Sequence, residues 1–407
     1  MRLYRLVIAI SALWIIQLQA QTIISLDEAI HQALVKNIEL QKQYSFIKKS
    51  ESLLNESSRI PNPILNYSRE DLKSNNTKIW EWIASGSLPL NFLWDRWSNI
   101  DSKEKSLEAQ RLLLDNTKRT VIFKVKDAYS KYHFYNQLII ELTSILVKID
   151  EISSTSKQRL IEGDISEYEL QRILIEVNKL RTEIKEIELE RNNFLNQLKL
   201  FIGYDPDKAL QTIPIQSLQK ITQSEEELLK IAIQNRNDLK AVKLLIESET
   251  AFLSHSKLKI IPNINLTAGY KNQLDNYSGS VFQLNFEIPL FKRNQFEIEQ
   301  SEVDINILER QKEYLLKQIK TEVHSSFAKY KQYEELITNK HDLPLLNVFT
   351  SAVYSYEQGD ISLVEFFDGL NAFKEGIKLN NELEIKFYQS IFELENVAAL
   401  SSIIENK

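Results

Sequence analysis

Long stretches of the chain place hydrophobic residues alternately three and four positions apart, which is the spacing of a coiled coil. Charged residues flank this stripe, which is clearest at Leu170, Ile173, Val177, Leu180, Ile184 and Ile187. The pattern predicts helices over Leu26–Arg59, Asp95–Glu162, Ile165–Ile202, Glu225–Leu258, Gln295–Gln358 and Ile361–Ile404. A helix of about 65 residues would be roughly 100 Å long. That length favours a tube or bundle over a globular domain.

Two other segments, within Ile64–Leu90 and Asn263–Leu290, alternate with period two and predict two strands each. Apolar positions on one face include Phe282, Leu284, Phe286 and Ile288, then Ile264, Leu266, Ala268 and Tyr270, then Trp80, Trp82 and Ala84. Each strand has about ten residues, which spans a bilayer when the strand is tilted. Half-buried strands of soluble proteins alternate in the same way, so the strands alone leave both interpretations open.

The number of strands constrains the membrane interpretation. Four strands cannot close a membrane barrel, for which about eight is the minimum. An open sheet edge is not viable in lipid. If these strands lie in a membrane, several chains must therefore share one barrel, and three chains would supply twelve strands.

The predicted order of helix, two strands, helix and helix occurs twice, over about 25–203 and 224–407, with β-hairpins at about 62–91 and 262–291. Four landmarks recur at an offset of about 200 residues in the same order. They pair Ser25–Leu40 with Ser224–Leu239, Ile60–Pro63 with Ile261–Ile264, Leu88–Leu90 with Ile288–Leu290, and Glu162–Ser166 with Gln358–Ser362. We interpret these regions as an internal repeat.

The N-terminus predicts a secretory signal over residues 1–20. Arg2 and Arg5 precede an apolar run, Leu6–Ile16, and a small-residue cleavage site follows at Ala20. The alternative is a transmembrane anchor, but the run is shorter than the roughly 20 apolar residues that a spanning helix needs. Residues 21–407 are expected to form a single domain.

Composition narrows the chemistry. The sequence has no cysteine, so disulfides, thiolate sites and an N-terminal lipidated cysteine are excluded. Its net charge of −6 gives no basic footprint for nucleic acid. The five histidines are far apart, and we expect them on helix surfaces rather than in a metal site. No nucleophile motif is present, so we expect no enzyme activity and no cofactor.

The repeated landmarks resemble the TolC family of outer-membrane efflux proteins over the whole mature chain, and the compact length resembles its heavy-metal cation-efflux branch. The resemblance implies a mainly α fold whose long helical hairpins form an α-barrel, with four strands per protomer in a trimeric, twelve-stranded transmembrane β-barrel. It also implies a passive duct in the outer membrane with a long periplasmic extension. The implied partners are two further copies, a periplasmic adaptor (membrane fusion protein), an inner-membrane pump of the RND type, and outer-membrane lipid.

The resemblance also assigns candidate residues. Glu365, Asp368, Glu169 and Tyr356 match positions that line or latch a periplasmic aperture. Gly163, Asp164, Gly359 and Asp360 match the hairpin tips that would contact an adaptor. Simple helix capping is the alternative for the two aspartates, and a solvated helix face is the alternative for Glu169. The arginine that the family places near the second turn is replaced by Ile361.

Tryptophans around the first predicted β-hairpin suggest an aromatic girdle at a bilayer interface, with Trp80 and Trp82 as its members. Packing between strands and helices explains Trp94 and Trp97 equally well. A second function remains open, that of a periplasmic coiled-coil adaptor or scaffold whose strands form a soluble sheet.

Overall fold

The structure, a computed structural model, describes residues 22–75, 77–215, 220–274, 276–339 and 345–400. The predicted signal segment lies outside the described residues. In chain order the elements are β1 (Thr22–Ile24), α2 (Leu26–Lys36), α3 (Ile38–Ser57), β2 (Ile64–Ser74), β3 (Thr77–Pro89), α4 (Phe92–Glu162), α5 (Glu167–Phe201), β4 (Leu210–Thr212), α6 (Glu225–Asn235), α7 (Asn237–Leu258), β5 (Asn263–Gln273), β6 (Ser278–Glu287), α8 (Gln295–Thr338), α9 (Leu345–Gln358) and α10 (Leu363–Ala398). The prediction of a mainly helical chain with a small β part is confirmed.

The chain divides into two compact units, and each unit combines separate segments of the sequence. Unit 1 comprises Met1–Gln41, Thr117–Gln234 and Ile319–Lys407, and unit 2 comprises Lys42–Asn116 and Asn235–Gln318. The helices α4 and α8 contribute residues to both units. Among the described residues, no helix combines the length and the apolar character needed to cross a membrane.

Two predicted continuous helices, Leu26–Arg59 and Glu225–Leu258, are each interrupted near the middle. Asn37 separates α2 from α3 with an extended backbone (ψ 131°), and Arg236 separates α6 from α7 in the same way (ψ 114°). The Asn37 side chain compensates for the break, since its Oδ1 accepts from the Glu39 amide and its Nδ2 donates to the Phe201 carbonyl at 3.0 Å. These tertiary and local hydrogen bonds replace the helical ones, and hydrophobic spacing alone did not reveal them.

The predicted helix Gln295–Gln358 is also wrong as a single element. It ends at Thr338, and α9 starts at Leu345. Pro344 was the signal in the sequence, because proline disfavours helix in the residue before it. The last helix is shorter than predicted, since it ends at Ala398 and Ala399 adopts a left-handed backbone with φ 53°.

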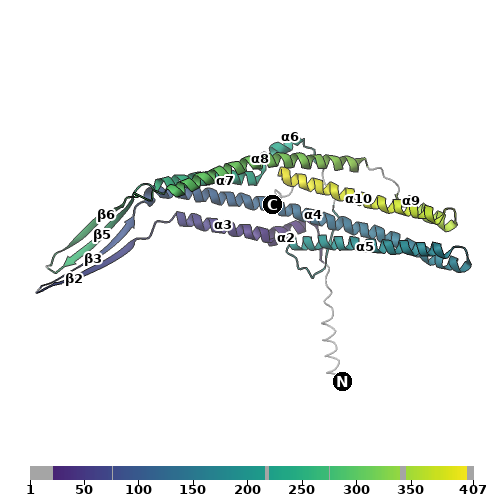
Figure 1. Cartoon of the computed structure of the whole chain (residues 1–407), viewed down its shortest axis with the longest axis horizontal. Coiled ribbons are helices and arrows are strands. Elements are labelled where there is room, and N and C mark those ends of the chain that lie inside the picture. The colour runs from purple at the N-terminus through teal and green to yellow at the C-terminus, as the bar shows by residue number, and fades with distance from the viewer. Residues whose placement is uncertain (1–21, 76, 216–219, 275, 340–344, 401–407) are drawn as a thin grey trace, which may run out of the picture. The chain divides into compact units, whose positions relative to one another are not determined.

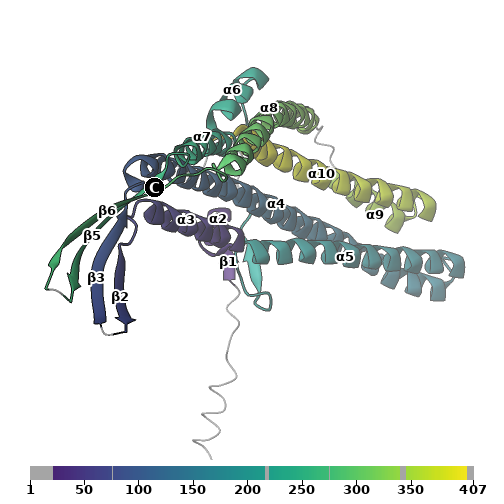
Figure 2. The same cartoon turned by 60° about the vertical axis from the view of Figure 1, so that its left-hand side comes forward.

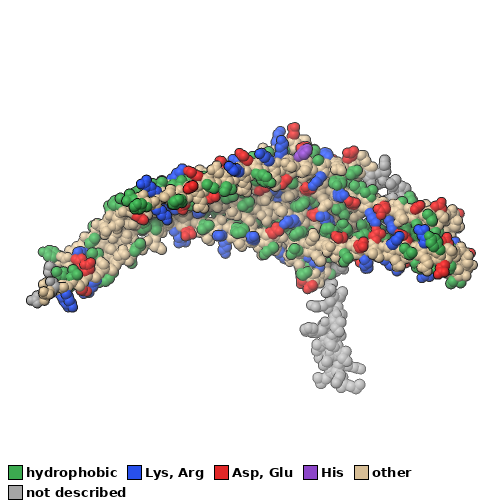
Figure 3. Space-filling view, in the orientation of Figure 1, with side chains coloured by type: hydrophobic (Ala, Val, Ile, Leu, Met, Phe, Trp, Pro, Cys, Tyr) green, Lys and Arg blue, Asp and Glu red, His purple; other side chains and the backbone are tan. Residues whose placement is uncertain are grey.

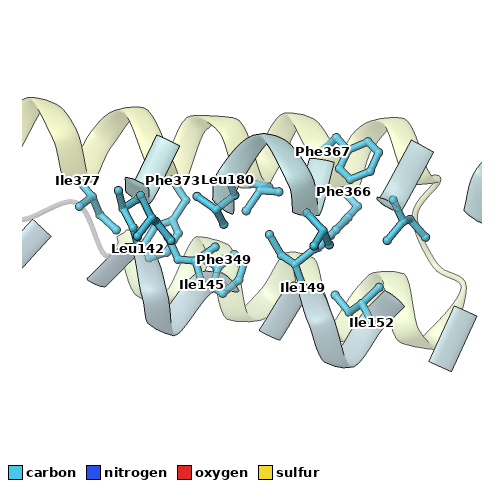
Figure 4. Packing of buried hydrophobic residues seen from close by; sticks show 14 of the residues in the cluster. Leu142, Ile145, Ile149, Ile152, Leu180, Phe349, Phe366, Phe367, Phe373 and Ile377 are labelled. Atoms are coloured by element: carbon cyan, nitrogen blue, oxygen red, sulfur yellow. The ribbon is translucent and has the colours of Figure 1, made fainter. Parts of the chain in front are cut away.

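The core of unit 1 is formed by two helical hairpins, which we call the first helical hairpin (α4–α5) and the second helical hairpin (α9–α10) (Figure 1). Leu142, Ile145, Ile149 and Ile152 of α4 pack with α5 and with the aromatic residues of α9 and α10 (Figure 4). The Phe349 and Phe373 rings stack with their centroids 4.8 Å apart. The predicted stripe on α5 is confirmed, because Leu170, Ile173, Val177, Leu180 and Ile184 are all buried.

Unit 1 also contains a two-stranded parallel sheet that the sequence did not predict. Its strands, β1 and β4, pair Thr22 with Leu210 and Ile24 with Thr212. The buried Tyr129 hydroxyl of α4 lies 3.0 Å from the Ile24 carbonyl oxygen and 2.8 Å from that of Ile213. Strands of three residues are too short to show alternation, so no periodic signal was available.

Unit 2 contains the four predicted longer strands in one antiparallel sheet of order β2-β3-β5-β6 (Figures 1 and 2). The two β-hairpins therefore meet through β3 and β5, which pair Leu88 with Leu266 and Ala84 with Tyr270. Within the described residues, the outer edges of β2 and β6 have no partner strand.

Candidate functional site

One face of the unit 2 sheet is exposed and mainly apolar, although the Arg69–Asp71 ion pair of β2 lies on it beside Trp80 and Trp82. The strand register places Tyr67, Trp82 and Tyr270 on this face, with Trp82 two residues along β3 from Ala84, the residue that pairs with both tyrosines. The Trp82 ring centroid lies 6.3 Å from that of Tyr67 and 6.1 Å from that of Tyr270. On β6 the same face carries Phe282, which is 79% exposed, with Leu284 and Phe286 beside it. Figure 3 shows hydrophobic side chains at the surface of this part of the chain. An apolar face of this size is expected to contact lipid or another protein.

The opposite face is mainly polar. Glu81 and Lys271 form an ion pair of 2.6 Å across β3 and β5. Gln283 donates to Asn285 at 2.7 Å along β6. Thr267 of β5, which pairs with Gln283, is buried. The predicted alternation of apolar and polar faces is therefore present, although Ile79 and Ile83 also lie on the polar side by register.

Gly269 marks the closest approach between the central strands. A Cβ atom at this position would lie 2.6 Å from the Ala84 carbonyl oxygen and 2.6 Å from the Ser85 Cβ. Neither partner atom can move away without disturbing the β3–β5 ladder. Only glycine fits here, so the packing of the two β-hairpins depends on this residue.

The two helical hairpins turn in the same way. Gly163 and Gly359 adopt left-handed backbones, with φ 81° and φ 79°. The next amide in each turn, Asp164 or Asp360, donates to a carbonyl five residues back, at 2.9 Å and 2.8 Å. This is the Schellman arrangement, in which a glycine ends one helix and directs the chain into the next.

Serines cap the helices that leave these turns. Ser362 begins α10, its hydroxyl accepting from the Glu365 amide, and its own amide donates to the Glu365 carboxylate at 2.7 Å. Ser166 and Glu169 form the same capping box at the start of α5. The hydrogen bonds from Ser362 lower the pKa of Glu365 below its ordinary value.

The capping interpretation of the two turn aspartates is wrong. Ser166 and Ser362 occupy the N-cap positions, and Asp164 and Asp360 lie two residues before them. Both aspartates are exposed. Neither side chain makes a hydrogen bond or an ion pair with another described residue. The two carboxylates are therefore exposed at the hairpin tips, while the amides of the same residues close the turns.

Tyr356 and Asp368 occupy opposite environments. Tyr356 is buried, and its ring stacks on Phe366 at 5.0 Å. Burial raises the pKa of the Tyr356 phenol, which is a hydrogen-bond partner of Ser156. Asp368 is exposed one turn after Glu365 and contacts no described cation. In the first helical hairpin the matching position holds Arg172, whose guanidinium lies 5.5 Å from the Phe367 ring.

Comparisons with known proteins agree with this geometry. No family model matches the sequence, and no curated protein matches it. Solved structures do match. CusC, described by its transmembrane channel formation, has a TM-score of 0.75 at 16% identity, over 92% of this chain and 91% of its own. The outer-membrane channel CmeC of Campylobacter jejuni has a TM-score of 0.77 at 14% identity, over 92% of this chain and 85% of its own. The outer-membrane channel OprN has a TM-score of 0.77 at 13% identity, over 92% and 89%.

The chain has the fold of these outer-membrane channels. The resemblance inferred from the repeated landmarks is thereby confirmed at the level of the fold. On that fold, the predicted aperture residues Glu365 and Asp368 are exposed on α10, while the predicted latch Tyr356 belongs to the core. Their roles in a channel remain predictions.

The aromatic girdle predicted from Trp80 and Trp82 stays a prediction, and the structure gives the surroundings of these residues. Trp80 and Trp82 lie on the apolar face and are half-buried. Trp97 at the start of α4 is 65% exposed, and Phe291 after β6 is 92% exposed. Phe291 was not among the predicted residues, although its place directly after the second Pro-Leu landmark was a usable signal.

Two histidines contradict the expectation of surface positions. His133 and His255 are buried, and burial lowers the pKa of both imidazoles. The Nδ1 atom of His255 lies 2.8 Å from the Asp95 carbonyl oxygen. Within the described residues, no group of three His, Asp or Glu side chains is arranged to hold a metal ion.

A buried ion pair between the helical hairpins was not predicted from the sequence. Lys374 of α10 lies 2.9 Å from Glu176 of α5, and the side chains are only 8% and 11% exposed. Lys378 contacts Glu183 one turn further along the same helices. Lys374 falls within the apolar stripe of α10, and a charge at such a position was the available signal.

Proposed function

We propose that this chain is one protomer of a homotrimeric outer-membrane channel, a passive exit duct that continues into the periplasm. The observation that carries the proposal is the sheet of unit 2. It has an exposed apolar face, and its outer edges, β2 and β6, have no partner among the described residues. Lipid does not tolerate open sheet edges. In a membrane these edges must pair with other copies of the chain, and three copies would supply twelve strands.

Cysteine cross-linking tests this arrangement directly, because the natural sequence has no cysteine. Ser68→Cys on β2 would be combined with Val281→Cys, Gln283→Cys or Asn285→Cys on β6, which lie on one face by register. We expect at least one pair to give an oxidised ladder that ends at the trimer. Each single variant is the control and should give no cross-linked species, because pairing of β2 with β6 keeps identical positions of neighbouring copies apart.

The opposite outcome is equally specific. A monomer that fractionates without detergent and gives no ladder with any pair would contradict the trimeric channel. It would support the alternative of a periplasmic adaptor or scaffold. Conductance in planar bilayers provides the second measurement, since only the channel proposal predicts it.

The proposed partners follow from the fold and from the exposed hairpin tips. We propose that substrates arrive from an inner-membrane pump, of the RND type, through a periplasmic adaptor that contacts the two turns. Support comes from Asp164 and Asp360, which are exposed beside the turn glycines. Charge reversal at both aspartates should abolish co-purification of the cognate adaptor while leaving the trimer intact. Unchanged co-purification would contradict this contact.

We also propose that Glu365 and Asp368 line the periplasmic aperture, with Glu169 as their counterpart in the first helical hairpin. Three protomers would form a ring of carboxylates, which favours cations and binds divalent ions. Glu365→Gln with Asp368→Asn should raise conductance or relieve block by divalent cations. Glutamine can still complete the capping box. The matched control, Glu375→Gln with Glu382→Gln, removes two charges further along α10 and should change neither. Unchanged conductance and block in the first variant would reject the assignment.

A further inference from the structure

A polar pocket lies in unit 2 where the first β-hairpin joins the helices. Its volume is about 310 Å³. Pro61, which precedes β2, and Asn91, which follows β3, both line it. The pocket therefore sits at the end of the sheet, between the last turn of α3 and the first turns of α4.

The charged groups of the pocket are unbalanced. Its lining includes the cations Arg59, Arg96 and Lys103 and the carboxylates Glu56 and Asp95. None of the three cations makes an ion pair with a described residue. Asp95 is held by Asn91, whose Nδ2 donates to its Oδ2 at 3.3 Å. His255 also lines the pocket, and burial lowers its pKa, so it adds no charge at neutral pH.

Arg96 is the residue that most needs a partner. Its Nε is buried and has no hydrogen-bond partner within the described residues. An unsatisfied donor of a charged group carries a substantial cost. The guanidinium carbon lies 5.1 Å from the ring of the exposed Trp97. Stacking on an aromatic face leaves the N–H edge of an arginine available to an oxyanion, which it can bind in a bidentate way.

We propose that this pocket binds the phosphodiester of an anionic phospholipid, with Arg59, Arg96 and Lys103 as its cationic contacts. The inference rests on the proposed membrane insertion of the sheet. Two observations select lipid as the source of the phosphate. The pocket lies at the end of a sheet with an exposed apolar face, and the apolar side chains Leu93 and Trp97 are exposed on α4 beside it. The single excess positive charge matches the single negative charge of a phosphodiester.

Native mass spectrometry of the full-length protein in detergent tests the proposal. We expect the wild type to retain phosphatidylglycerol in preference to phosphatidylcholine, whose choline cancels the headgroup charge. Arg59→Gln with Arg96→Gln should weaken retention at least about tenfold, since each cation near a lipid headgroup contributes substantially to binding. The matched control is Lys292→Gln with Arg293→Gln, which removes two charges at the exposed end of the second β-hairpin and should retain the lipid like the wild type.

Several results would overturn the proposal. Equal retention in the Arg59/Arg96 variant and the wild type would remove the site. Equal retention of the two lipids by the wild type would remove the charge argument. Displacement of phosphatidylglycerol by an equal concentration of inorganic phosphate would assign the pocket to a free anion instead. If the double variant does not fold, Lys103→Gln provides the same comparison with a smaller expected loss.

The same samples separate this inference from the proposed function. A wild-type trimer that conducts but retains no phosphatidylglycerol would refute the lipid site and leave the channel proposal intact. A monomer that binds phosphatidylglycerol through Arg59 and Arg96 would refute the trimer and leave the pocket assignment intact.

Discussion

The two helical hairpins follow the same plan but contribute different side chains to their shared core. The first helical hairpin supplies only aliphatic residues, such as Leu142 and Ile149, whereas the second supplies all of the rings, such as Phe349 and Phe373. Charge divides in the same way, since α5 provides the buried Glu176 and α10 provides the buried Lys374. The difference shows that similar turns and similar spacing do not make the hairpins interchangeable. The shared core needs both the aliphatic residues of the first helical hairpin and the rings of the second.

The largest effect is expected from separating the buried charges. Lys374→Met would remove the buried partner of Glu176 and leave only the exposed Lys179 near its carboxylate. Breaking a buried ion pair in this way typically costs about 3–5 kcal/mol of unfolding free energy. Thermal unfolding followed by circular dichroism measures the loss. Lys179→Met is the matched control, because Lys179 approaches the same carboxylate at 3.6 Å but is 68% exposed. The control should change stability by less than about 1 kcal/mol. Equal effects would mean that the hairpins are not joined by this pair.

A similar asymmetry distinguishes the β-hairpins. Gly269 on the central strand β5 aligns with Ser68 on the edge strand β2, at the offset of the Ile-Pro landmarks. Gly269→Ala would drive a methyl group into the Ala84 carbonyl and should cost about 1–3 kcal/mol.

Gly279→Ala is the control for this prediction, since a Cβ there meets no atom within 4 Å. Thermal unfolding of the two variants would be compared in the same detergent. If Gly279→Ala proved as destabilising as Gly269→Ala, the close contact between β3 and β5 would not be the cause.

Alanine substitution should destabilise the protein equally at the two turn glycines. A Cβ at Gly163 or at Gly359 would meet nothing within 4 Å, so the cost of alanine is only that of a left-handed backbone. We expect each substitution to destabilise by about 1 kcal/mol. Unequal losses in thermal unfolding would show that the two turns differ in their surroundings despite their common geometry.

The smallest expected effect is the pH dependence of the capping box at the start of α10. The pKa of Glu365 is lowered, so its contribution is complete above the ordinary value of 4.5 and is lost as the pH falls through the lower folded value. Hydrogen exchange at the Ser362 amide, corrected for intrinsic rates, should therefore rise below that pH. Glu365→Gln should show no such dependence, because an amide oxygen accepts at any pH. A pH-independent wild type would contradict the capping box.

The sequence by itself determined where most of the long helices and the four longer strands lie and in what order, because these features depend on local spacing. The stripe around Ile173 and Val177 specified a helix with one buried face, and the glycines with following serines specified the turns. Alternation around Phe282 and Leu284 specified a strand. Proline before Leu345 marked a boundary that hydrophobic spacing concealed.

Only the tertiary structure decided which faces meet and which groups remain without partners. The contact of Asn37 with Phe201 at the first helix break, the Lys374–Glu176 pair and the burial of Tyr356 depend on residues distant in the sequence. The polar pocket is of the same kind, since it combines α3, α4 and α7. Local spacing cannot encode such contacts, because they arise only when chain segments separated by many residues pack together.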